Sequence, residues 1–114
     1  MKNLQSQSEF DQILQNSHNN QVLLCKFSPI CPTSLMAQRE VEEFLHTREL
    51  ENWSIDVIKS RALSRSIAEQ IKVRHESPQA FIIKNEKVMW HGSHYDLTRE
   101  KLAQKWLEAE SSEL

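Results

Sequence analysis

One stretch decides the architecture of this chain: Val22-Leu23-Leu24-Cys25-Lys26-Phe27, followed by Ser28-Pro29-Ile30-Cys31-Pro32-Thr33-Ser34. Its first part is a mostly apolar run, which is typical of a central strand covered by helices on both faces. The segment after Pro32 has helical periodicity, and proline suits the first helical position because its φ is already helical. Cys31 is therefore expected where a buried strand gives way to the N-terminus of a helix.

Cys31 is the candidate catalytic residue, because a thiolate is the nucleophile in disulfide exchange. The unpaired amides and partial positive charge of a helix N-terminus can lower a cysteine pKa from about 8.5 to roughly 3.5–7.5. Cys31-Pro32-Thr33-Ser34 has the outline of a redox motif whose second cysteine is replaced by serine. Pro32 and Ser34 are expected to support the thiolate, Ser34 as a hydrogen-bond donor to the sulfur. Serine does not attack a mixed disulfide, so an external thiol must release any partner bound to Cys31.

The structural alternative is that Cys31 is a small hydrophobe filling the end of a strand. The proline and the two hydroxyl residues that follow it favour the redox interpretation. Cys25 is interpreted in the opposite way, because it lies within the apolar run. At ~3.3 Å per residue, the intervening strand and turn place the two α-carbons beyond the roughly 7 Å that a disulfide allows. We expect a buried structural thiol at Cys25, with a resolving cysteine as the alternative.

Helical and strand patterns alternate along the chain. Helices are predicted after a capping box at Ser6–Glu9, along the apolar face from Ala37 to Leu45, from Leu63 to Ile71, and after a capping Thr98. Strands are predicted at Val22–Phe27, Trp53–Val57, Ala80–Lys84 and Lys87–His91, the last two joined by a hairpin turn at Asn85-Glu86. The β-α-β crossover implies parallel pairing of the first two strands, and the hairpin implies antiparallel pairing. The order αβαβαββα predicts an α/β, thioredoxin-like domain with a four-stranded mixed sheet flanked by helices.

A second part of the candidate site is Glu76-Ser77-Pro78-Gln79, which precedes the third predicted strand. Proline directly before this strand is the usual place for the cis-proline of thioredoxin-like domains. A cis bond before proline costs only about 0.5–1 kcal/mol. In that form the backbone of Ser77 turns toward the cysteine, where it can pair with a disulfide-bearing substrate. The alternative is a trans proline that marks the entrance of a strand.

The histidines are weaker candidates. His75 is a possible substrate-binding residue, as a proton donor or positive charge near Cys31, although a structural hydrogen bond is the simpler interpretation. His91-Gly92-Ser93-His94 is a poor metal signal, because two histidines and one cysteine do not define a site. We therefore expect no metal. The tryptophans are expected in the core or at its rim.

Composition narrows the class of protein. At 114 residues with 39% hydrophobic content, the chain is expected to form a single domain over residues 1–114. A net charge of −2 without a basic block argues against nucleic acid, and one glycine leaves no phosphate-binding glycine loop. The N-terminus lacks an apolar signal region and no apolar run approaches the roughly 20 residues of a membrane span. A cytoplasmic location without membrane contact is the expectation, and there thiols stay reduced unless catalytic, redox-sensing or metal-bound.

Taken together, these segments resemble the YtxJ-like family of monothiol bacilliredoxins, from about Leu4 to Leu107. The resemblance is carried by Lys26–Ser34, Ser66–Glu69, Val73–Gln79 and Trp90–Thr98. It implies a thioredoxin-like fold, a cytoplasmic stress-related role, and Cys31 as the attacking cysteine. It also implies a reaction, the removal of bacillithiol from S-thiolated client proteins, with bacillithiol as co-substrate and no bound cofactor.

Three alternatives remain at this point. The same chemistry with glutathione or coenzyme A is not separated by the residues. A thioredoxin-like adaptor that binds without turnover predicts a Cys31 pKa near the free value of about 8.5. An iron–sulfur carrier is less favoured, because monothiol glutaredoxins of that kind have glycine and phenylalanine after the cysteine, where this chain has Pro32-Thr33. The oligomeric state is not indicated.

Overall fold

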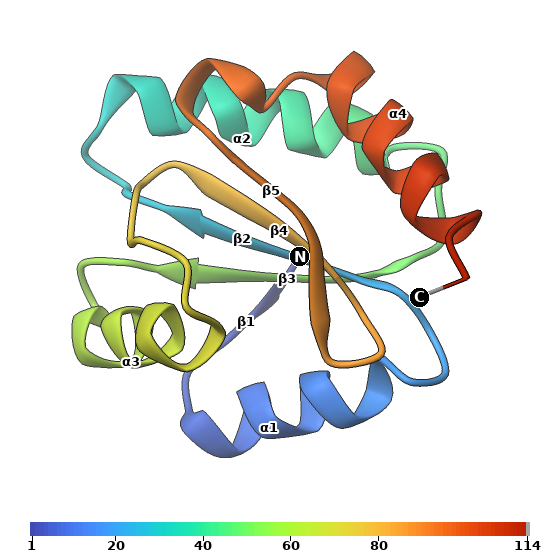
Figure 1. Cartoon of the computed structure of the whole chain (residues 1–114). Helices are drawn as coiled ribbons and strands as arrows, with labels where there is room; N and C mark the ends of the chain where they lie inside the picture. Colours follow the sequence, from blue (N-terminus) through green and yellow to red (C-terminus); the bar gives the residue numbers. More distant parts are fainter. Residues whose placement is uncertain (114) are drawn as a thin grey trace.

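A mixed sheet lies between two pairs of helices in the computed structural model, which describes residues 1–113. The predicted domain range ends at Leu114, which lies outside the described residues. The elements in chain order are β1 (Lys2–Asn3), α1 (Gln7–Asn16), β2 (Val22–Phe27), α2 (Pro32–Leu45), β3 (Glu51–Asp56), α3 (Arg61–Ile71), β4 (Gln79–Lys84), β5 (Lys87–Ser93), the 3-10 helix η1 (His94–Asp96) and α4 (Arg99–Glu110). Figure 1 shows α2 and α4 on one face of the sheet and α1 and α3 on the other.

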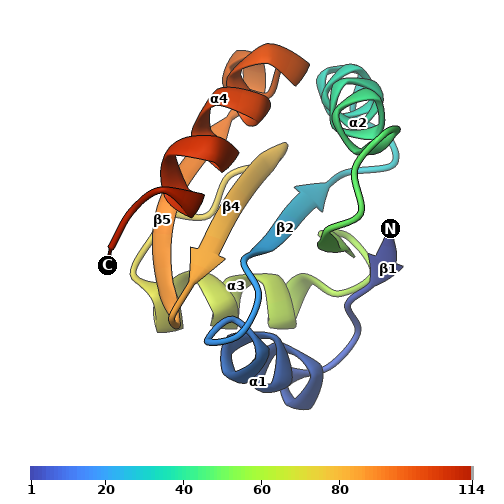
Figure 2. The same ribbon diagram turned by 90° about the vertical axis from the view of Figure 1, so that its right-hand side faces the viewer.

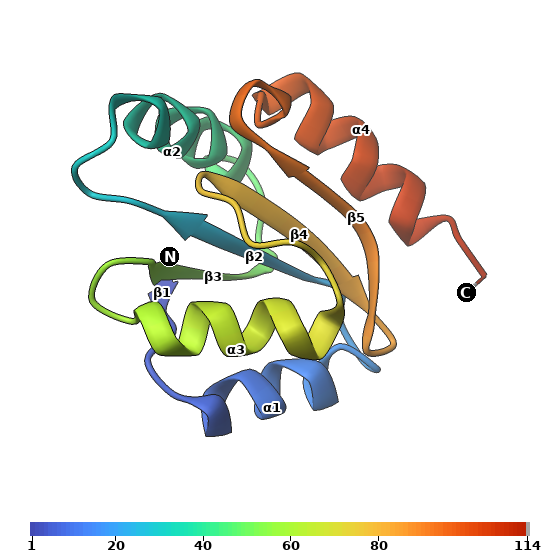
Figure 3. The ribbon, with the colours of Figure 1, turned by 60° about the vertical axis from the view of Figure 1, so that its left-hand side comes forward.

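The sheet has the strand order β1-β3-β2-β4-β5, so β2 is its central strand. β2 pairs in parallel with β3 and antiparallel with β4, and β4 and β5 form the predicted antiparallel hairpin. All six residues of β2 are buried, as expected for a strand covered on both faces. Figures 2 and 3 show the same two helix layers from other sides.

The predicted strand count was wrong by one. Lys2–Asn3 forms the edge strand β1, which pairs in parallel with β3. Both of its side chains are exposed, and the amide of Leu4 continues the pairing with a 2.7 Å hydrogen bond to the carbonyl oxygen of Ser54. Two exposed residues carry no period-two pattern, so backbone pairing in the folded state is the signal that defines this strand.

Local sequence signals account for most helix and strand ends. Ser6 caps α1 by accepting from the amide of Glu9 at 3.1 Å, while the Glu9 carboxylate accepts from the amide of Gln5 rather than from that of Ser6. Thr98 caps α4 by accepting from the amide of Lys101. At the hairpin turn, Asn85 and Glu86 have φ values of 53° and 62°, as a two-residue type I′ turn requires.

The core has two parts, one on each face of the sheet. Cys25 and Phe27 of β2 pack with α2 and α4, whereas Leu24 of β2 packs with α1 and α3. The alternation follows from the period of two along a strand. Trp106 is buried in the first part, and the other two tryptophans pack against the cores, which confirms their predicted structural role.

Candidate functional site

Cys31 occupies the N-cap of α2, immediately beyond the central strand. Its backbone is extended (φ −101°, ψ 121°), and its carbonyl oxygen accepts from the amide of Leu35 at 3.1 Å. Pro32 takes the first helical position, where a missing N–H removes no helical hydrogen bond. The thiol is free and partly exposed. The sequence prediction of a cysteine at a strand-to-helix junction is therefore confirmed.

The first turn of α2 makes the Cys31 sulfur more acidic. The backbone amide of Ser34 is the largest cause and that of Thr33 the second, and a smaller contribution comes from the Thr33 hydroxyl; together they outweigh partial burial and lower the pKa of the Cys31 thiol. The thiol does not meet the geometry of a full capping hydrogen bond, so the amides act mainly through their orientation toward the sulfur. This is the environment expected of a reactive cysteine.

Ser34 has a different arrangement from the predicted one. Its side chain is buried, and its hydroxyl oxygen accepts a 2.8 Å hydrogen bond from the backbone N–H of Ser28. This bond holds together the two ends of the loop that carries Cys31. Ser34 thus bears on the sulfur through its backbone amide, while its hydroxyl braces the loop. Thr33, which the sequence analysis did not single out, contributes both an amide and a hydroxyl.

Replacing Ser34 with alanine is expected to lower the free energy of unfolding by about 1 kcal/mol, because the amide of Ser28 loses its acceptor. Urea denaturation measures this change. Ser8→Ala, at an exposed position of α1, is the matched control and should stay within about 0.5 kcal/mol of the parent. Equal stabilities of the two variants would show that the Ser34 hydroxyl does not brace the loop.

Cys25 is sealed in the core. It has no exposed surface and lies between Ser54 of β3 and Ala80 of β4. Burial raises the pKa of the Cys25 thiol, so its thiolate is strongly disfavoured. The two cysteines are not bridged. The interpretation of Cys25 as a buried structural thiol is confirmed.

The loop of Ser77 and Pro78 lies beside the segment that carries Cys31. Gln79 of β4 pairs with Lys26 of β2, so both loops leave the same end of neighbouring strands. The peptide bond between Ser77 and Pro78 is cis, as the sequence predicted. The hydroxyl of Ser77 is buried and has no hydrogen-bond partner among the described residues. Buried polar groups without a partner are uncommon, and this one lies in the loop next to the segment that carries Cys31.

His75 is half-buried and contacts the buried polar side chains of Lys26 and Ser64 on the α3 side of the sheet. The Lys26 ammonium, which has no exposed surface, donates to the carbonyl oxygen of Ser64 at 3.0 Å and lies 3.1 Å from Nδ1 of His75. Burial, and then the charge of Lys26, lowers the pKa of His75, with Arg65 and Arg61 adding to the effect. This arrangement favours a neutral, structural His75 over a positive charge near Cys31.

Two buried polar side chains hold this loop, and the sequence analysis assigned neither of them a role. Lys26 contacts His75, and Gln79 donates to the carbonyl oxygen of Arg74 at 3.0 Å while accepting from the amide of Glu76 at 3.2 Å. The sequence did contain a signal for Lys26, because it is a lysine within the apolar run Val22–Phe27, which was predicted to be buried on both faces. A charged side chain that is never exposed needs polar partners, and here they come from the loop before Pro78.

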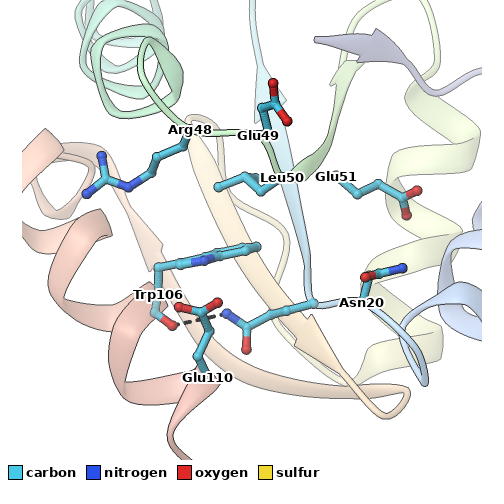
Figure 4. A pocket seen from close by; sticks show the side chains of 8 residues that line it. Asn20, Arg48, Glu49, Leu50, Glu51, Trp106 and Glu110 are labelled. Carbon is cyan, nitrogen blue, oxygen red and sulfur yellow. Dashed lines mark hydrogen bonds between the residues drawn. The ribbon is translucent and has the colours of Figure 1, made fainter.

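A cavity at the opposite end of the sheet is not part of this site. It has a volume of about 670 Å³ and lies where β2 and β3 begin. The Gln21 side chain donates a 3.1 Å hydrogen bond to the carbonyl oxygen of Trp106, which also lines the cavity. Figure 4 shows the side chains of Arg48 and Glu49 pointing away from Trp106. Its polar groups do not converge on one point, so it carries no functional assignment.

Within residues 1–113, no group of three or more His, Cys, Asp and Glu side chains is placed to hold a metal ion. His91 is exposed on β5 with its ring 6.5 Å from that of Phe81, and His94 begins η1. In the same part of the chain, none of the helices combines the length and the apolar character that crossing a bilayer requires.

Comparison with known proteins agrees with this geometry. The chain matches the family model of monothiol bacilliredoxin BrxC over residues 2–102. A solved thioredoxin-fold protein, described as a proposed oxidoreductase, is 34% identical, with a TM-score of 0.84 over 92% of each chain. Thioredoxin from Schistosoma mansoni is 15% identical, with a TM-score of 0.74 over 93% of this chain and 94% of that chain. Thioredoxin f from spinach chloroplast is 16% identical, with a TM-score of 0.75 over 96% and 93%. The thioredoxins show the fold alone, and the predicted thioredoxin-like fold is confirmed.

Proposed function

Because this chain belongs to the monothiol bacilliredoxin family, we propose that it removes bacillithiol from protein mixed disulfides through Cys31. The observation that carries the proposal is the contrast between its two cysteines. Cys31 is partly exposed and its pKa is lowered, whereas Cys25 is sealed and its pKa is raised. One reactive sulfur without a second reactive thiol matches a monothiol mechanism.

The first step transfers the small thiol to Cys31. The Cys31 thiolate attacks the bacillithiol sulfur of the client's mixed disulfide, that S–S bond breaks, and the client thiolate leaves and takes a proton from water. In the second step a free bacillithiol thiolate attacks the bacillithiol sulfur held on Cys31. Bacillithiol disulfide and the Cys31 thiolate are released. In total, one mixed disulfide and one free bacillithiol are consumed, and one reduced client and one bacillithiol disulfide are formed, so thiols and disulfides balance.

Single-turnover mass spectrometry tests this route. A client that carries one bacillithiol is mixed with the reduced protein in equal amounts, without free thiol. We expect the client to lose bacillithiol and Cys31 to gain it. A client that remains modified would contradict the proposal. Repeating the turnover with glutathione and coenzyme A adducts identifies the thiol that is used, which the family alone leaves open.

The pH profile of alkylation separates this enzyme from a non-catalytic adaptor. The first turn of α2 stabilises the thiolate, so the midpoint for iodoacetamide reaction at Cys31 is expected below the free-thiol value of about 8.5. Alkylation rates between pH 5 and 10, followed by intact mass, give this midpoint. Cys25→Ala is the control and should have the same profile. A midpoint at or above about 8.5 would favour the adaptor.

A further inference from the structure

A groove opens between α2 and η1, and Thr33, two residues after Cys31, is one of the residues that line it. Its volume is about 380 Å³. Ala37 and Leu97 are buried and form its floor, whereas Met36 and Tyr95 are 61% and 81% exposed along its sides. Figures 1 and 3 show η1 next to α2 in both views. The exposed side chains have no evident role in the core, so the groove has apolar walls open to a ligand.

One interaction with the Cys31 sulfur and one with the cis-proline loop relate the groove to the candidate site. Thr33 lines the groove, and its hydroxyl also helps to lower the pKa of the Cys31 thiol. On the other side, the amide of His94 donates a 3.0 Å hydrogen bond to the carbonyl oxygen of Pro78. This bond fixes the start of η1 against the cis-proline loop. A group joined to Cys31 through a disulfide can therefore extend from the sulfur into the groove.

The charged side chains along the groove differ in whether they already have a partner. At its far end, Glu40 accepts from the amide of Arg99 at 3.0 Å, and Glu43 lies 3.8 Å from the Arg99 guanidinium. Both carboxylates are thus occupied by the start of α4. Arg39 also lines the groove and is exposed, and its guanidinium makes no hydrogen bond or ion pair with any of residues 1–113. A planar guanidinium of this kind suits a carboxylate, which it can bind in a bidentate manner.

We propose that this groove holds the body of a carboxylate-bearing low-molecular-weight thiol while its sulfur is joined to Cys31. The inference rests on the proposed function and assigns new roles to two residues. The Tyr95 ring packs against the body of the small thiol, and Arg39 binds a carboxylate. A volume of about 380 Å³ matches a small molecule and lies within the usual range of ligand pockets. A protein client would then approach the Cys31 sulfur from the side that does not face the groove.

A series of symmetrical disulfides tests the groove. The probes are bacillithiol disulfide and glutathione disulfide, which carry carboxylates, cystamine, which carries ammonium groups, and 2-hydroxyethyl disulfide, which is neutral and short. The rate of adduct formation at Cys31 is followed by intact mass at pH 7. Each probe is reacted with the parent protein, Arg39→Gln and Tyr95→Ala. Arg65→Gln and Leu107→Ala, at exposed positions of α3 and α4, are the matched controls.

Arg39→Gln is expected to slow the carboxylate-bearing probes about five-fold, the equivalent of about 1 kcal/mol for an exposed ion pair, and to leave 2-hydroxyethyl disulfide unchanged. Tyr95→Ala should slow the larger probes by a similar factor. Both controls should match the parent.

The rate of each probe can be divided by the rate of 2-hydroxyethyl disulfide with the same protein. If these ratios are the same in Arg39→Gln and Tyr95→Ala as in the parent, the groove assignment is overturned and the proposed function stands. No adduct from any probe on the parent protein would overturn both. Because 2-hydroxyethyl disulfide reports the sulfur alone, a folding defect in a variant is recognised as a loss with all four probes.

Discussion

Cys31→Ser is expected to abolish turnover, with a loss of at least about a thousand-fold in the release of bacillithiol from a client. Serine keeps the shape of the side chain and the N-cap position, but its hydroxyl stays protonated at neutral pH. The amides of Thr33 and Ser34 that favour a thiolate then have no anion to stabilise. Because Cys25 has no exposed surface, no other sulfur of this chain takes over the attack.

Cys25→Ala is the matched control for this loss. It removes the second thiol without placing a hydroxyl in the core, and it should retain turnover at some cost in stability. Intact mass after exposure to bacillithiol disulfide gives an independent reading: one adduct on the parent and on Cys25→Ala, and none on Cys31→Ser. An adduct that persists in Cys31→Ser and disappears in Cys25→Ala would show that the roles are reversed.

The second large effect is a pH-dependent stability that comes from Lys26. Burial lowers the pKa of this lysine from 10.5 to about 8. Between these two values the unfolded chain binds more protons than the folded chain, so the stability of the folded state rises with pH. Relative to Lys26→Met, the parent protein is expected to gain about 2–3 kcal/mol in free energy of unfolding between pH 7 and pH 10. Methionine has a similar length and no titrating group.

Other titrating groups change the absolute profile, so the difference between the two proteins is the quantity to measure. Because the pKa of the Cys25 thiol is raised, this group makes stability fall as pH rises above the ordinary cysteine pKa. Because the pKa of Cys31 is lowered, that group makes stability rise as pH approaches the ordinary cysteine pKa from below. Both terms are present in the parent and in Lys26→Met and cancel in the difference. The lowered pKa of His75, the nearest titrating partner of Lys26, places its effect below pH 7.

Urea denaturation at pH 7, 8, 9 and 10 under reducing conditions supplies these free energies. Lys59→Met, at an exposed position, is the control and should run parallel to the parent. If the free energies of unfolding of the parent and of Lys26→Met differ by the same amount at every pH, Lys26 is not desolvated in the folded state. The His75 ring is expected to keep its position in the variant, because the Ser64 hydroxyl lies 3.3 Å from its Nδ1.

The elements most accurately predicted are those with a strong local pattern. The apolar run at Val22–Phe27 became β2 with the same bounds, and the caps Ser6 and Thr98 begin α1 and α4. The strand predicted from Trp53 begins earlier, at Glu51, where polar residues pair with β2 through their backbone. β1 was missed for the same reason, since pairing of two exposed residues is decided by the neighbouring strand.

The same division holds within the site. Cys31 and Pro32 were found from their place at the start of a helix, and Ser77-Pro78 from its place before a strand. The role of the Ser34 hydroxyl was not found, because its acceptor bond to the amide of Ser28 exists only when the loop is closed. The contacts between Lys26 and the loop before Pro78 likewise join residues that are far apart in the chain.

The sequence by itself determined that Cys31 lies at a helix N-terminus and that Cys25 is buried within a strand. A cysteine before a proline at a helix N-terminus meets oriented amides, and a cysteine within an apolar strand loses water, whatever else surrounds them. Only the tertiary structure decided what lies around Cys31. The pairing of β2 with β4 brings the Pro78 loop next to the loop that carries Cys31. The bond from His94 to Pro78 fixes the start of η1 to the Pro78 loop, and the groove lies between η1 and α2. These contacts depend on strand register and packing, which arise between distant segments and leave no local trace in the chain.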